Sequence, residues 1–211
     1  MALLTEAELQ PAVAAECLAL AHLLEDLPSS SWDAQSLCAN WRVREVVAHL
    51  TMPARYPTPR FILELLKARG NFTRMSDRCA RRDATLPSQS FVAALRGPTM
   101  HTWKPPGGGY QGALTHMVIH SLDVMVPLGI HRQFADERIR TVLDGLTKQR
   151  SLKYFKVDFA GIELRADDLD WTFGSGETLT GSGTDLALVL GGRTLPAERL
   201  HGEPARRFTA T

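Results

Sequence analysis

Apolar positions over roughly the first 150 residues recur at the three- and four-residue spacing of helices that face a core. The first predicted helix follows Thr5, which with Glu8 matches a capping box, and ends near Leu27; Pro11 weakens its start. Pro28 and the serines behind it end that helix. Further helical segments are predicted at 43–50, 61–66, 90–95, 114–125 and 136–146.

The pattern changes after about residue 153, where apolar and polar residues begin to alternate. This period of two predicts strands at 157–166 and 169–173, and a third at 177–181. An apolar helix is expected at 184–190, ended by Gly191 and Gly192. The chain is therefore predicted to be mainly α within the α+β class, with a helical domain over 1–152 and a small α+β domain over 153–211.

Composition narrows the classes of function. The 211 residues are 44% apolar, as in an ordinary globular protein. A formal charge of +1 argues against nucleic acid as a partner, and no apolar run approaches the ~20 residues of a membrane span. The first residues lack the pattern of a signal peptide, so we expect a cytoplasmic protein. Three cysteines (17, 38 and 79) fit neither a disulfide framework nor a zinc ribbon.

Among seven histidines, three stand apart by their context. His116 and His120 are four residues apart, so they share one face of a helix and can reach one metal ion. His49 lies in an apolar stretch where a solvated side chain would be out of place. Facing helices of a bundle bring such positions together in the core. The alternative for each is a histidine that is merely buried and hydrogen-bonded.

Other polar residues complete the candidate site. Asp123, three residues after His120 and near the same face, either orients that histidine or is simply exposed. The arginines at 74, 78, 81 and 82 form a solvated face or attract an anionic substrate. Met117 replaces the glutamate of a zinc protease motif, which argues against that class.

Three segments of the sequence resemble one family. Trp41-Arg-Val-Arg-Glu-Val-Val-Ala-His-Leu is similar to the segment around the first metal histidine in the actinobacterial maleylpyruvate isomerase-like proteins of the DinB-like superfamily. Thr115-His-Met-Val-Ile-His-Ser-Leu-Asp-Val resembles their third-helix motif. The segments 169–174 and 180–193 resemble their small C-terminal domain, which is akin to sterol carrier folds.

The resemblance implies a four-helix bundle that holds a divalent metal, usually zinc and alternatively nickel, through His49, His116 and His120. It also implies mycothiol as a thiol co-substrate, a small-molecule substrate, and an isomerase or S-transferase activity. Arg193 aligns with an arginine that assists catalysis in the family. Read without the family, Arg193 is a cation at a helix C-terminus. A monomer or a homodimer is expected, without nucleic acid or membrane partners.

One position departs from the isomerase pattern: His116 stands where the maleylpyruvate enzyme often has glutamate. Three neutral ligands make a stronger Lewis acid, which argues against maleylpyruvate itself as the substrate. Two further hypotheses remain at this point. One is a metal-dependent hydrolase with Glu45 or Asp123 as general base. The other is a non-catalytic binding or stress protein.

Overall fold

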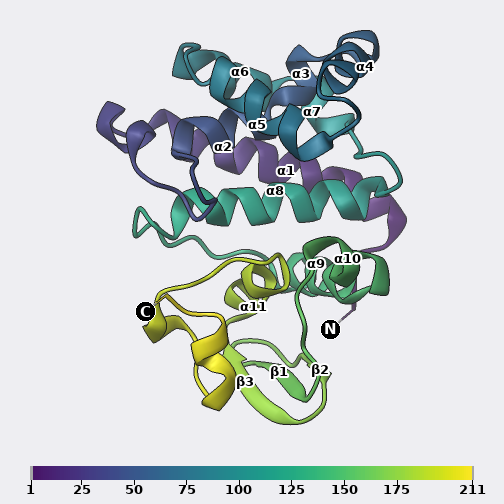
Figure 1. Ribbon diagram of the computed structural model, residues 1–211, viewed down its shortest axis with the longest axis vertical. Helices are drawn as coiled ribbons and strands as arrows, with labels where there is room; N and C mark the ends of the chain where they lie inside the picture. The colour runs from purple at the N-terminus through teal and green to yellow at the C-terminus, as the bar shows by residue number, and fades with distance from the viewer. Residues whose placement is uncertain (1, 211) are drawn as a thin grey trace. The chain divides into compact units, whose positions relative to one another are not determined.

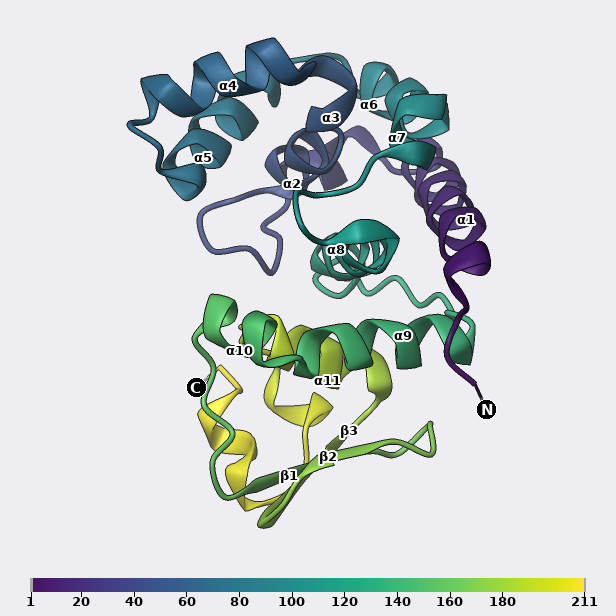
Figure 2. The ribbon, with the colours of Figure 1, turned by 90° about the vertical axis from the view of Figure 1, so that its right-hand side faces the viewer.

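A computed structural model describes residues 2–210, and these divide into two compact units. One unit is Ala7–Ile130 and is helical; the other consists of the residues up to Glu6 and those from His131 on. Figures 1 and 2 show the elements of each unit. None of the described helices is long and apolar enough to cross a membrane.

The helical unit is built around two helices that carry the histidines. The short helix α2 (Val43–Leu50) packs against both α5 (Phe72–Asp83) and the long helix α8 (Gly109–Met125). The remaining elements are α1 (Glu6–Glu25), the 3-10 turn η1 (Ser29–Asp33), α3 (Met52–Arg55), α4 (Thr58–Lys67), α6 (Ser88–Arg96) and α7 (Pro98–Thr102). The predicted helical bundle is confirmed, and the helices near 43–50 and 114–125 lie where the apolar spacing placed them.

Helix α8 has no solvent-exposed face over its second half, because it lies in the core of this unit. Every residue from Met117 to Met125 is buried, including the polar side chains His120, Ser121 and Asp123. A helix that is buried on all sides must satisfy such groups with internal partners. The polar residues of α8 are therefore the first place to look for a site.

The second unit combines a three-stranded sheet with helices. Its elements are α9 (Asp136–Thr147), α10 (Gln149–Phe155), β1 (Ile162–Ala166), β2 (Thr172–Gly174), β3 (Glu177–Gly181), α11 (Gly183–Leu190), and the 3-10 turns η2 (Ala197–Arg199) and η3 (Glu203–Arg207). The strand order is β2-β1-β3, with β1 antiparallel to β2 and parallel to β3. The small α+β part predicted from the alternating pattern is thus present.

The compact units divide after Ile130, because α9 packs against the apolar helix α11. The domain boundary expected after residue 152 stays a prediction. The first predicted strand is corrected: it begins at Ile162 instead of Val157. The carboxylate of Asp158 accepts the amide of Ala160 at 2.9 Å and Gly161 has a φ of +74°, so a turn occupies this stretch.

Candidate metal centre

His49 reaches the centre of the helical unit from the last turn of α2. Its side chain is buried, with 8% of the residue exposed, and its Nδ1 lies 2.8 Å from the hydroxyl of Ser76 on α5. The other ring nitrogen, Nε2, is thereby directed away from α5. Packing of α2 between α5 and α8 thus determines the orientation of this imidazole.

His116 and His120 meet His49 from successive turns of α8. The Nε2 atoms of His49 and His116 are 3.1 Å apart. One nitrogen from each of the three imidazoles lies within 4.8 Å of the others. The structure therefore brings together the three histidines that the sequence singled out, and we call them the histidine cluster.

The geometry of the cluster fits a metal ion. In tetrahedral zinc sites with Zn–N near 2.0–2.1 Å, two ligand nitrogens lie roughly 3.3 Å apart. The separation of 3.1 Å between the Nε2 atoms of His49 and His116 is close to that value. Three imidazoles would leave a coordination position open, which is the pattern of a catalytic site.

Asp123 supports the cluster from behind His120. Its Oδ2 lies 2.8 Å from His120 Nδ1, and the residue is fully buried. A carboxylate in this position holds the proton on Nδ1 and leaves the lone pair of Nε2 for a metal. The orienting role predicted for Asp123 therefore has the required geometry.

Cys38 also belongs to this centre, although its spacing in the sequence gave no reason to include it. Its thiol donates to Asp123 Oδ2 at 3.1 Å, and Cys38, His120 and Asp123 form a second group of mutually close metal-binding atoms. The contact joins residues 85 positions apart, so only the fold reveals it. Ser76 was missed for the same reason.

Two tryptophans flank the histidines. The ring centroid of Trp41 lies 5.2 Å from that of His49, and the ring centroid of Trp103 lies 5.3 Å from that of His116. Indole rings at these distances restrict water and limit the rotation of the imidazoles. The indole nitrogen of Trp41 donates to Asp77 at 2.9 Å, which fixes that ring in turn.

Glu45, the base considered for hydrolysis, is engaged at the start of α2. It accepts the backbone amide of Arg42 at 2.8 Å and a guanidinium nitrogen of the same residue at 2.6 Å. Burial by itself would raise the pKa of Glu45, but the hydrogen bonds and charge of Arg42 hold it below the usual value. Glu45 is thus a capping residue, which the sequence analysis did not recognise.

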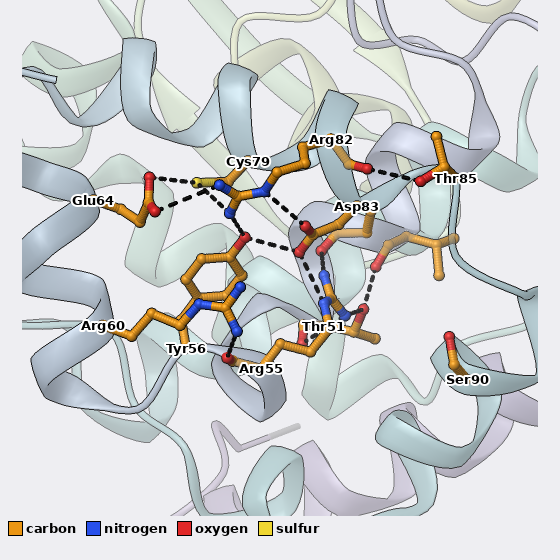
Figure 3. A network of polar contacts seen from close by, with 12 residues as sticks. Thr51, Arg55, Tyr56, Arg60, Glu64, Cys79, Arg82, Asp83, Thr85 and Ser90 are labelled. Carbon is orange, nitrogen blue, oxygen red and sulfur yellow. Dashed lines mark hydrogen bonds and ion pairs between the residues drawn. The ribbon is translucent and has the colours of Figure 1, made fainter. Parts of the chain in front are cut away.

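A polar network ties the C-terminal end of α2 to α5 (Figure 3). Arg55 donates to the carbonyl oxygens of Ala48 and Thr51, the residues that surround His49 near the helix end, at 2.5 and 3.2 Å. The buried carboxylate of Asp83 accepts from Arg55 Nε at 2.9 Å and from the hydroxyl of Tyr56 at 2.9 Å. Asp83 and Ser76 lie on the same helix, so the Arg55–Asp83 pair helps to place His49 opposite Ser76.

We expect Asp83→Asn to lower the free energy of unfolding by about 1–3 kcal/mol, because it leaves Arg55 and Tyr56 without a buried charged acceptor. Denaturant unfolding followed by circular dichroism measures this change. Glu25→Gln, at an exposed ion pair with Arg96 in the same unit, is the control and should cost less than about 1 kcal/mol. Equal stability of Asp83→Asn and the unmodified protein would show that the network contributes little.

Most arginines of the run on α5 form ion pairs within the helical unit. Arg78 pairs with the buried carboxylate of Glu64 at 2.7 Å, and Arg81 pairs with Asp77 at 2.9 Å. Arg82 contacts the hydroxyl of Tyr56 and lies 3.4 Å from Glu64. These pairings favour a structural role over the substrate-binding role considered for the run, whereas Arg74 is exposed.

Arg193 lies in the other unit, at the end of α11. Its guanidinium donates to the carbonyl oxygen of Gly191 at 2.6 Å, as expected of a cation at a helix C-terminus. It also lines a cavity of about 290 Å³ together with Lys156 and Arg207. The catalytic role that the resemblance implies for Arg193 stays a prediction.

Fold and histidine cluster together define the class: a helical bundle that carries a candidate metal centre, followed by a small α+β unit. Residues 13–102 match the family model described as the mycothiol maleylpyruvate isomerase N-terminal domain. The chain therefore carries a domain of this family, and the resemblance found in the sequence is confirmed.

Solved structures extend the likeness beyond that domain. The crystal structure of the mycothiol-dependent maleylpyruvate isomerase is similar over 96% of this chain and 94% of its own, with a TM-score of 0.63 and 13% identity. A mutant of that isomerase with a histidine replaced by alanine gives the same values. At this identity the likeness establishes a shared fold over both units. No curated protein sequence matches the chain.

Proposed function

We propose that this protein is a metal-dependent enzyme that uses a low-molecular-weight thiol, mycothiol by analogy with its family, on a small electrophilic substrate. The reaction is a cis–trans isomerisation or an S-transfer. The observation that carries the proposal is the opposed pair of Nε2 atoms of His49 and His116, 3.1 Å apart, with His120 beside them. The family domain and the shared fold support an enzyme of this kind.

In this proposal the three histidines hold the cation, with zinc favoured by the all-nitrogen donor set and nickel as the alternative. When bound, such a cation lowers the pKa of a thiol at its open position and keeps the sulfur as a thiolate at neutral pH. Asp123 keeps the proton on His120 Nδ1, and Ser76 accepts the corresponding proton of His49. Both contacts direct Nε2 lone pairs into the cluster.

Isomerisation and S-transfer share their first step in this scheme. The thiolate sulfur adds to a conjugated double bond, which becomes a single bond that rotates. Loss of the thiolate restores the double bond in an isomerase, whereas protonation of the adduct ends the reaction in a transferase.

Because His116 replaces the glutamate of the isomerase pattern, we favour an electrophile other than maleylpyruvate. Arg193 is our candidate for binding a substrate carboxylate. We expect a cytoplasmic location, where such thiols are kept reduced.

The experiment combines metal analysis with a thiol-dependent assay. Protein purified without chelator should contain about one divalent metal per chain. Consumption of a small α,β-unsaturated carbonyl probe should require mycothiol and stop after the metal is removed by dialysis against chelator. Less than about 0.1 metal per chain would contradict the metal centre. Turnover that is indifferent to thiol would instead favour the hydrolase hypothesis.

A further inference from the structure

The outer face of α4 is apolar although it is exposed. Phe61 and Leu65, on the inner face, pack against a buried cluster that includes Tyr56 and Met75. On the outer face, Ile62, Leu63 and Leu66 are exposed by 50%, 51% and 68%. A surface helix of a globular protein is usually polar on its outer side, so an apolar outer side indicates a face that is covered in the functional state.

Phe72, at the start of α5, extends this apolar surface. The residue is 42% exposed, and its ring centroid lies 6.4 Å from that of Phe61. We call the four exposed side chains Ile62, Leu63, Leu66 and Phe72 the α4 ridge. In Figures 1 and 2, α4 lies at the edge of the helical unit, on the far side of that unit from α8. No residue of the ridge belongs to the histidine cluster.

Four exposed cations lie on or beside α4, and we call them the cationic rim: Arg60, Lys67, Arg69 and Arg74. Two of them also have partners within the unit, because Lys67 pairs with Glu64 at 3.2 Å and the Arg60 guanidinium lies over the ring of Tyr56. The only acidic residue between positions 57 and 76 is Glu64, which is buried and accepts from Arg78 at 2.7 Å. Residues 55–83 contain eight Lys and Arg against three Asp and Glu, so this segment has a formal charge of +5 in a chain whose total is +1.

The charge pattern decides between the occupants of the ridge. A second copy that docked through the same face would bring two cationic rims together, and their repulsion opposes a symmetric dimer. An anionic lipid surface is complementary to the rim. Long Lys and Arg side chains can also extend to the headgroups while the apolar residues enter the boundary with the acyl chains.

We propose that the α4 ridge binds anionic membrane surfaces peripherally. This inference is independent of the proposed enzyme function, because no residue of the ridge belongs to the histidine cluster. A ten-residue helix with three exposed apolar side chains, extended by Phe72 of α5, supports weak and reversible binding that depends on both apolar contact and charge. Cytoplasmic leaflets carry the negative surface potential that this mode of binding requires.

The test is co-sedimentation of the full chain with vesicles of phosphatidylcholine, with or without 30% phosphatidylglycerol. We expect a partition coefficient at least about tenfold higher for the anionic vesicles, and its loss in 0.5 M NaCl. The double variant Leu63→Glu/Leu66→Glu should lower binding to anionic vesicles at least about tenfold. Leu18→Glu, at a 48% exposed leucine of α1, is the matched control and should bind like the unmodified protein.

Four outcomes would overturn the proposal. The first is equal binding to both kinds of vesicle, or to neither. The second is unchanged vesicle binding by the double variant with native circular dichroism, since the ridge would then be unused. The third is a dimer in sedimentation velocity that the double variant dissociates while vesicles bind no protein, which would assign the ridge to a second copy. The fourth is binding to soluble polyglutamate that is as tight as binding to anionic vesicles and that the double variant retains. Charge attraction alone would then explain the binding.

Discussion

His116→Ala should lower bound metal from about one per chain to below about 0.1, because two imidazoles fall short of the three protein ligands of a catalytic zinc site. Thiol-dependent turnover should fall with it, by at least about a hundredfold. The helical signal in circular dichroism should persist, since the fold of α8 depends on buried neighbours such as Leu114 and Val118. Metal analysis by mass spectrometry and the probe assay measure the two effects.

The control for this prediction is His22→Ala. His22 lies on α1 with 77% of its side chain exposed, so its removal deletes an imidazole without touching the cluster. It should retain full metal content and activity. A His116→Ala protein that keeps its metal would remove this residue from the centre and leave His49 and His120 to be explained by other partners.

Asp123→Asn should weaken metal binding about 10–100-fold, which is the effect typical of groups that orient a ligand histidine. The carboxylate fixes the proton on His120 Nδ1, at 2.8 Å. An amide can present its NH₂ group instead, which stabilises the opposite tautomer and occupies the Nε2 lone pair with a proton. Competition against a metallochromic chelator measures the dissociation constant directly.

Cys38→Ala separates the role of Asp123 from that of the thiol. It removes the 3.1 Å contact to Asp123 but leaves the contact between Asp123 and His120. We expect its metal affinity to change by less than about threefold, because the tautomer of His120 is preserved. An effect as large as that of Asp123→Asn would indicate that the sulfur of Cys38 itself binds the metal.

The sequence predicted the parts of the centre that depend on local spacing. A spacing of four positions from His116 to His120 places both on one face of α8, and the apolar setting of His49 predicted its burial. Asp123 followed from the same helical geometry. The helical bundle and the small sheet could also be predicted from the sequence, because hydrophobic periods of 3.6 and 2 residues distinguish helix from strand.

Contacts between distant segments could not be predicted in this way. Ser76 reaches His49 because α5 packs on α2, and Cys38 reaches Asp123 across 85 positions. Neither residue has a distinguishing pattern around it. The division of the compact units after Ile130 also has no signal in the sequence, because α9 has the same helical periodicity as the bundle helices while its packing partner is α11.

The assignment of the first residues to the second unit has a consequence for engineering. The amide of Leu4 donates to the hydroxyl of Thr141 at 3.0 Å, so a short N-terminal segment belongs with residues from His131 on. The polypeptide therefore passes from one unit to the other twice, once before Ala7 and once after Ile130. In a chimaera, the helical unit would have to be transplanted as an insertion with two junctions, because a simple end-to-end fusion would leave the N-terminal segment behind.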